Sequence, residues 1–428
     1  MSTATHPHSL DEPVVLEKTV VVSWKAPIAY AIFTVLLLVL VAAAPQDGNT
    51  TFRLSTAADA IQIPEIAVPA LPATWIAVIL LALATAFAAS RVATKRRVPL
   101  WLTVVFAVLF MFGFLTWAAA GSAIPVVGLL FGAVSLAVPL VYGALAGVIG
   151  ERVGVVNIAI EGQLLAGAFS AAVVASITRQ LWLGVLAAMI AGVLVAFVLA
   201  AFSITYFVDQ VIVGVVLNVL VVGLTSFFFT QVLVPNAAAL NNPPRFDRWP
   251  IPLLGDIPLI GPVFFRQTVI VYLVYILVAA VYVGLFHTKW GLRLRAVGEH
   301  PQAADTVGIK VNSTRFWNVA LAGAIAGLGG TVFTIGSGVA FNKEMTAGAG
   351  YIALAAVIFG QWDPIKATLA ALLFGFASNL QNTLSVIGSP VPSEFMLMLP
   401  YVVTILAVAG IVGKVRGPAA AGKPYVKS

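Results

Sequence analysis

The stretch that decides the fold reads Gly291-Leu-Arg-Leu-Arg-Ala-Val-Gly-Glu-His-Pro-Gln-Ala-Ala-Asp-Thr-Val-Gly-Ile-Lys310, and it lies between two long hydrophobic segments. Each of its charged side chains would be costly in the hydrocarbon of a membrane, so we expect a loop that faces water. Pro301 suits the first turn of a helix and Gly308 suits the residue after its end, which predicts a short helix between them. The small side chains of Ala303 and Ala304 would let a second protein approach this helix closely.

The composition assigns the chain to a membrane. Of its 428 residues, 61% are hydrophobic and 9% are charged, whereas soluble proteins carry about 25% charged residues. The chain has no cysteine, which excludes disulfides, thiolate metal sites and cysteine nucleophiles. In a membrane protein a net charge of +7 indicates basic cytoplasmic loops, so we do not interpret it as affinity for nucleic acid.

About twelve hydrophobic segments approach the roughly 20 residues that a membrane-spanning helix needs. The segment at 351–362 is short for a crossing, which leaves the count open by one or two. The expected spans are 27–44, 73–90, 99–119, 126–148, 155–178, 181–203, 211–233, 267–287, 317–337, 351–362, 366–382 and 397–413.

The distribution of basic residues predicts the orientation. An even number of spans places both termini on one side, and the cytoplasmic loops of membrane proteins are enriched in Lys and Arg. With cytoplasmic termini, all but six of the 23 Lys and Arg residues fall on the cytoplasmic side, together with segment 291–310. The six on the outer side are Arg53, Arg179, Arg245, Arg248, Arg266 and Lys343.

The pattern Gly-x-Arg-x-Arg-Ala-Val-Gly-Glu-x-Pro-x-Ala-Ala-x-x-x-Gly-Ile, which begins at Gly291, resembles the cytoplasmic coupling loop of ABC-importer permeases. It is most similar to that of the simple sugar and nucleoside branch, which is related to the ribose and branched-chain amino-acid permeases, and in particular to guanosine-type subunits. In that family the short helix of the loop docks into a groove of the ATPase subunit. The resemblance implies a coupling role for Arg295, Gly298, Glu299, Pro301, Ala303, Ala304, Asp305 and Gly308.

A second motif, Arg152-Val-Gly-Val-Val-Asn-Ile-Ala-Ile-Glu-Gly-Gln163, puts polar side chains into a lipid-compatible stretch. Asn157 and Glu161 are four residues apart, so they would share one face if the segment were helical. A carboxylate in the membrane usually faces a cavity or a partner, but Glu161 would equally suit the capping of a broken helix end. The motif resembles the family's Ser-Gly-Val-Val-Asn-Ile-x-x-Glu-Gly, with Val153 where serine is common. In the family this motif lies near the translocation pathway at a discontinuous helix.

Two further features point to a pathway between two halves. The stretch 348–364 is a second hydrophobic element interrupted by glycine, and two such elements at comparable places are typical of an inverted repeat, here with halves 99–233 and 267–413. Asn218 is an isolated polar group in mid-span, for which a pathway role and an interhelical hydrogen bond are both open. Gly323 and Gly327 form a small-xxx-small face, which we interpret as helix packing.

We therefore expect an all-α polytopic membrane protein: a type II ABC-importer permease core of about ten helices, preceded by two additional transmembrane helices. The resemblance covers roughly residues 120–413. The expected domains are 1–98 with a cytoplasmic N-terminus and the two extra helices, 99–413 as the permease core with an external loop at 234–266, and a basic cytoplasmic tail at 414–428. The external loop would serve either as a docking surface for a substrate-binding protein or as a plain connection.

The resemblance implies a permease subunit of a bacterial inner-membrane importer that moves nucleosides or simple sugars inward by alternating access. Its partners would be an ABC ATPase, a second related permease, an extracellular substrate-binding lipoprotein and membrane lipid. The chain contains no phosphate-loop sequence, so we expect no enzyme activity and no cofactor, with ATP and Mg²⁺ used by the partner ATPase. Asn157, Glu161 and Asn218 are the candidate pathway residues. The alternatives are an ion-coupled secondary transporter and, with less support from the sequence, a membrane-embedded enzyme.

Overall fold

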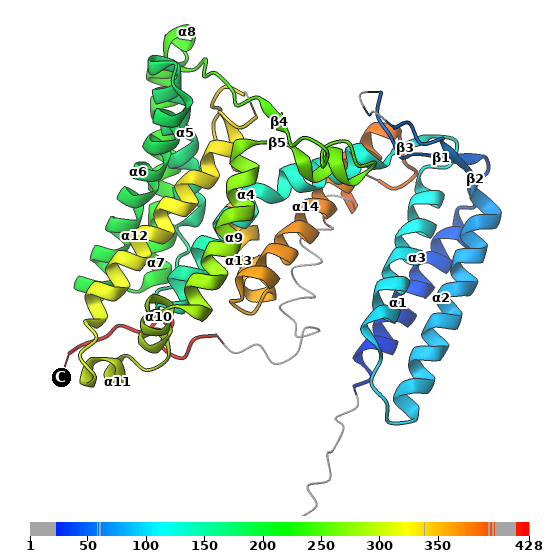
Figure 1. Cartoon of the computed structure of the whole chain (residues 1–428), viewed down its shortest axis with the longest axis horizontal. Coiled ribbons are helices and arrows are strands. Elements are labelled where there is room, and N and C mark those ends of the chain that lie inside the picture. Colours follow the sequence, from blue (N-terminus) through cyan, green and yellow to red (C-terminus); the bar gives the residue numbers. More distant parts are fainter. Residues whose placement is uncertain are drawn as a thin grey trace, which may run out of the picture. The chain divides into compact units, whose positions relative to one another are not determined.

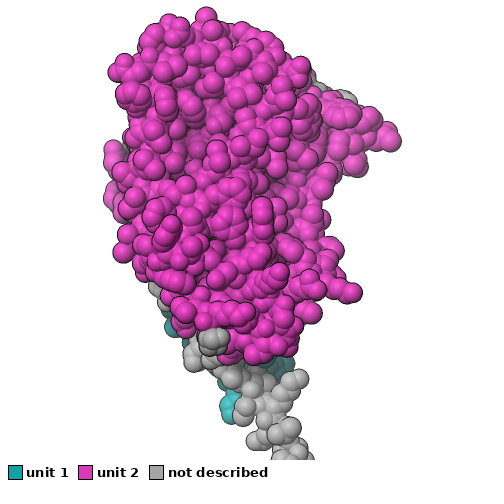
Figure 2. All heavy atoms as spheres, turned by 90° about the vertical axis from the view of Figure 1, so that its left-hand side faces the viewer, with its two compact units in different colours: residues 1–50, 68–121 teal, residues 51–67, 122–428 magenta. Residues whose placement is uncertain are grey.

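The computed structural model describes residues 23–57, 59, 61–337, 339–392, 394, 395, 398 and 417–427. Its contacts divide the chain into two compact units, residues 1–50 with 68–121 and residues 51–67 with 122–428. Figure 2 shows a face of the second, larger unit. Each unit is described separately below.

Unit 1 is a bundle of three apolar helices, α1 (Lys25–Ala43), α2 (Ala70–Ala93) and α3 (Leu100–Ala118). Tyr30 stacks on Phe106, with 4.2 Å between ring centroids, and so joins α1 to α3. Gly113 lies so close to Ala77 and Leu37 that α3 has no room for a larger side chain there. The sequence predicted a domain boundary at residue 98, between α2 and α3. The contacts in the structure place α3 in the same compact unit as α1 and α2.

Unit 2 contains the remaining helices, most of which run roughly side by side (Figure 1). Its long helices are α4 (Val126–Arg152), α5 (Ile160–Thr178), α6 (Leu181–Ala200), α7 (Gln210–Phe228), α9 (Val269–His287), α12 (Val311–Gly330) and α14 (Pro364–Ile387). Its shorter helices are α8 (Ala237–Leu240), α10 (Lys289–Glu299), α11 (Pro301–Thr306) and α13 (Ala349–Phe359). Turns of π-helix follow α6 and α7, at Ala201–Thr205 and Phe229–Leu233, and another lies at Gly261–Phe265; a 3₁₀ turn, Thr331–Phe333, follows α12.

The strands are short and lie in the connections. They are β1 (Asn49–Arg53), β2 (Ile66–Pro69), β3 (Ala123–Pro125), β4 (Arg248–Pro250) and β5 (Arg266–Thr268). In unit 2, β4 and β5 pair antiparallel with Arg248 opposite Thr268, and Thr51 of β1 pairs in parallel with Ala123.

Among the described residues, ten helices are long and apolar enough to cross a membrane, which confirms an all-α polytopic membrane protein. The expected span at 351–362 corresponds to α13, whose 11 residues reach only about 16 Å, half of the hydrocarbon thickness. The expected span at 397–413 lies, apart from Met398, outside the described residues.

Glycines let the central helices of unit 2 approach each other closely. A Cβ atom at Gly192 of α6 would overlap the carbonyl of Gly323 on α12, and one at Gly327 would overlap the carbonyl of Ala188. The predicted small-residue face at Gly323 and Gly327 is therefore confirmed as helix packing. These packed helices position the two sites described next, segment 291–310 and the polar residues around Glu161.

Candidate functional site

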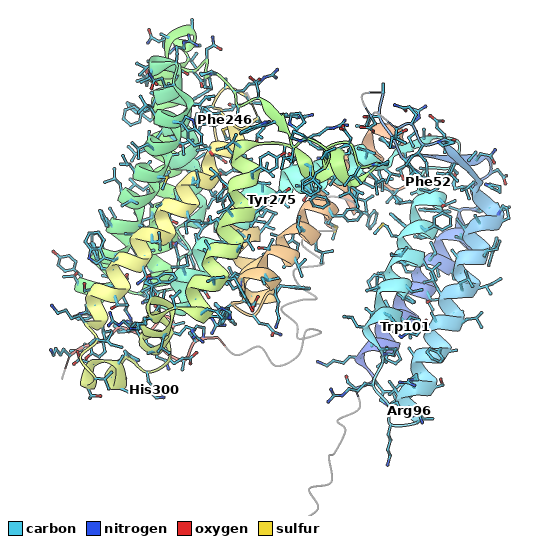
Figure 3. The ribbon with its side chains drawn as sticks, in the orientation of Figure 1. Phe52, Arg96, Trp101, Phe246, Tyr275 and His300 are labelled. Atoms are coloured by element: carbon cyan, nitrogen blue, oxygen red, sulfur yellow. The ribbon has the colours of Figure 1, made fainter. Side chains whose placement is uncertain are left out.

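The segment 291–310 forms the end of unit 2 where Figure 3 labels His300. The predicted short helix is confirmed as α11, with Pro301 in its first turn and Gly308 just beyond it at φ +85°, a conformation that favours glycine. The prediction of a loop was wrong for residues 291–299, which belong to α10. Leu294 and Val297 are fully buried on one face of α10, so tertiary packing stabilises a helix in spite of the charged residues.

The predicted coupling residues divide into an inward and an outward set. Pro301 and Ala304 are buried, whereas Ala303 is exposed and Val307 has 75% of its surface exposed. Gly298 contacts the backbone at Arg152, the last residue of α4, too closely for any side chain. The end of α10 is therefore packed directly against the end of α4.

The other predicted coupling residues are held by neighbouring side chains and backbone. The guanidinium of Arg295 lies 5.2 Å from the ring centroid of Phe286 on α9. Glu299 accepts a hydrogen bond from the backbone of Ala419, and Asp305 lies near the hydroxyl of Tyr425. Both carboxylates thus face the chain's C-terminal segment, which sequence reasoning had treated only as a basic tail.

The second site lies where α5, α7 and α13 meet. We call its polar residues the central junction: Asn157, Glu161, Gln163, Asn218 and Tyr351. The Glu161 carboxylate accepts hydrogen bonds from the Thr346 hydroxyl (2.6 Å) and from the N–H groups of Gly348 (2.9 Å) and Gly350 (2.6 Å). It therefore caps the start of α13 from the first turn of α5. Of the two roles that the sequence left open for Glu161, these contacts favour the structural cap.

The amides of the central junction are also fully engaged. Asn218 accepts from the N–H of Gly162 (2.8 Å) and donates to the carbonyl of Ile158 (2.9 Å) and the hydroxyl of Tyr351 (3.0 Å). Asn157 and Gln163 bond to each other. Because α5 begins only at Ile160, Asn157 precedes the helix, and the shared helical face expected for Asn157 and Glu161 does not exist.

Sequence reasoning missed Tyr351, the one member of the central junction that is substantially exposed, at 48%. The four polar side chains beside it are all buried. Its ring is therefore the part of this junction that a molecule outside unit 2 can touch. A tyrosine in an apolar helix is too common to have been a signal by itself.

The loop at 234–266, which the sequence predicted to be external, is structured. Phe246 is buried, and its N–H donates to the carbonyl of Ile335 (2.9 Å), while β4 pairs with β5. Figure 3 labels Phe246 at the end of unit 2 opposite His300. A cavity of about 680 Å³ lies beneath this loop, bordered by Arg245, Asp247, Arg248, Gln267, Ser135 and Phe131 among others.

Comparison with known proteins identifies the family of the chain. The family model described as branched-chain amino acid transport system / permease component matches residues 129–408. The guanosine ABC transporter permease protein NupQ of Bacillus subtilis is 42% identical over 306 residues, which are 68% of this chain and 94% of NupQ. The nucleoside ABC transporter permease protein NupC of Lactococcus lactis is 40% identical over 304 residues, 68% of this chain and 94% of NupC.

A sugar transporter is also among the relatives. The glucose ABC transporter permease protein TsgB13 of Haloferax volcanii is 30% identical over 251 residues, 56% of this chain and 65% of TsgB13. No solved structure matches the chain. The chain belongs to the permease components of the branched-chain amino acid transport family and, within it, to the permeases of nucleoside and simple-sugar ABC transporters.

Proposed function

We propose that this chain imports nucleosides by alternating access, driven by a separate ATPase subunit that binds at α11. The observation that carries the proposal is the backbone contact between Gly298, which precedes α11, and Arg152 at the end of α4. On the outer face of α11, Ala303 and Val307 are available to a partner. A push on α11 would thus reach the transmembrane helices directly.

The proposed topology places α10, α11 and both termini in the cytoplasm of a bacterial cell and the loop at 234–266 outside. The basic residues support it, since segment 291–310 and the C-terminal segment carry many of them. We also propose an external substrate-binding lipoprotein and a second permease. Support for the pair comes from two relatives of this chain in Bacillus subtilis, NupP and NupQ, which are both guanosine ABC transporter permease proteins.

For the pathway, we propose that Tyr351 faces the substrate and that Asn157, Glu161 and Asn218 hold the helices around it. The three side chains are buried and bonded to protein groups, whereas the Tyr351 ring is about half exposed. An exposed aromatic ring suits a nucleoside, because base–aromatic stacking is worth about 1–3 kcal/mol.

The second candidate function, ion-coupled transport, would use an exchangeable charge in the membrane. Glu161 is a poor candidate for that role, because three donors fix its carboxylate at the start of α13. This arrangement favours ATP as the energy source.

Uptake of labelled guanosine and ribose, each competed with the other unlabelled compound, tests the proposal in cells with and without this chain. We expect loss of guanosine uptake that ribose does not compete. Loss of ribose uptake alone would contradict the nucleoside substrate and leave a sugar permease. Guanosine uptake that survives ATP depletion while the ion gradients are clamped would favour ion coupling instead.

A further inference from the structure

The C-terminal segment 417–427 runs beside α10 and α11 in Figure 1, where it is drawn in red. The N–H of Ala420 donates to the carbonyl of Gly298 (2.9 Å), and the N–H of Ala419 donates to the Glu299 carboxylate (3.2 Å). The segment is therefore bonded to the last two residues of α10, directly before α11.

Two side chains fasten the rest of the segment. Arg315 of α12, only 1% exposed, donates from Nη1 to the carbonyl of Lys423 (2.9 Å). Tyr425 is buried, which raises the pKa of its hydroxyl, and Asp305 of α11 lies close enough to raise that pKa further. Segment 417–427 is thus bonded to the end of α10 and to α12, the helices on either side of α11.

The charged side chains of these two segments are mostly basic. Glu299 and Asp305 are the only two carboxylates of 299–310, and three exposed lysines outnumber them. The exposed cations are Lys310, Lys423 and Lys427, and no ion pair involves them within the part of the chain that the structure describes. The surface around α11 is therefore basic.

The same two segments also carry exposed apolar side chains. Val307 beyond α11 and Val426 in the C-terminal segment are exposed at 75% and 66%. Protein–protein interfaces combine apolar and polar side chains in this way. The C-terminal segment supplies side chains of both kinds.

We propose that segment 417–427 and α11 form one composite docking surface, and that its partner is an ATPase subunit with an acidic rim around the groove that receives α11. The proposal rests on the proposed function. Arg315 is the positioning residue, since it holds the segment beside α11 without reaching the surface itself.

The role of the basic side chains is tested by measuring how tightly variants of this chain bind the ATPase subunit that co-purifies with the wild-type chain. Lys423→Glu should weaken the complex about tenfold at low salt, with a smaller loss at high salt because the attraction is screened. Lys343→Glu, a matched reversal of an exposed lysine outside these segments, should leave the affinity unchanged. Equal affinities of the two variants would overturn the proposal.

Cross-linking tests proximity without disturbing a charge. Because the chain has no cysteine, a single Val426→Cys change gives one reactive site, and Leu253→Cys, 85% exposed in the external loop, is the control. We expect a photoreactive cross-linker attached to the cysteine, which reacts with any nearby group on illumination, to link the ATPase to the first variant and not to the second. Linking of neither, while the complex stays intact, would overturn the proposal.

Two further outcomes separate the hypotheses. If no ATPase co-purifies with the wild-type chain, the proposed function itself fails. If Lys423→Glu reduces binding only to vesicles containing phosphatidylglycerol, and not to the ATPase, the segment contacts anionic lipid and the composite docking surface is wrong.

Discussion

The central junction and the contact of segment 417–427 with Arg315 of α12 both join distant parts of unit 2, but their buried polar groups are bonded to different extents. At the central junction Asn157, Glu161, Gln163 and Asn218 all have hydrogen-bond partners. At the second contact, Nε and Nη2 of Arg315 are buried and have no partner among the residues that the structure describes.

The difference indicates two mechanical roles. Loss of one partner in a fully bonded buried network leaves other groups unbonded, so the central junction favours a single geometry. Buried donors without acceptors raise the energy of an arrangement, so the contact at Arg315 is less costly to displace. We expect the central junction to stay fixed while α11 and the C-terminal segment respond to a partner.

The largest expected effect comes from Glu161→Ala. It would leave the N–H groups of Gly348 and Gly350 without their acceptor inside the protein, and one such group costs about 1–3 kcal/mol. We expect a free energy of unfolding lower by roughly 3 kcal/mol and poor accumulation in the membrane. Glu161→Gln keeps one acceptor oxygen and should lose less, as measured by thermal unfolding in detergent. Normal stability with lost transport would show instead that Glu161 acts on substrate.

A smaller effect is expected from adding one methyl group at the same junction. A Cβ at Gly350 would overlap the backbone of Glu161, so Gly350→Ala should destabilise the protein by about 1–3 kcal/mol. Gly223→Ala on α7 is the matched control, because nothing lies within 4 Å of its added Cβ. It should be neutral or slightly stabilising, since alanine favours a helix over glycine. Equal melting temperatures for the two variants would contradict the close contact between α5 and α13.

The sequence predicted elements whose signal is local. Hydropathy located the ten described spans, and Pro301 and Gly308 marked the ends of α11, because these signals depend only on neighbours in the chain. The sequence did not predict α10, because burial of Leu294 and Val297 stabilises this helix in spite of its charged residues.

The candidate sites were predicted less completely, because their bonds join distant residues. The pattern around Asn157 and Glu161 marked the central junction, but whether Glu161 met a ligand or a helix end depended on Gly348 and Gly350, almost 190 positions away. Arg315 fell outside the expected span at 317–337, and nothing local indicated its bond to Lys423.

The smallest effect on stability is expected for Arg315→Met, which tests the contact between Arg315 and segment 417–427. Methionine fills much of the same space and removes two buried donors that lack partners, which offsets the loss of the one bond to the Lys423 carbonyl. We expect the free energy of unfolding to change by less than about 1 kcal/mol. The loss of the bond to Lys423 should nevertheless release segment 417–427, so amide exchange there should rise while exchange in α13 stays unchanged. A loss of stability as large as that of Glu161→Ala would show that Arg315 is as rigidly built into the structure as the central junction, and the distinction between a fixed and a displaceable contact would be wrong.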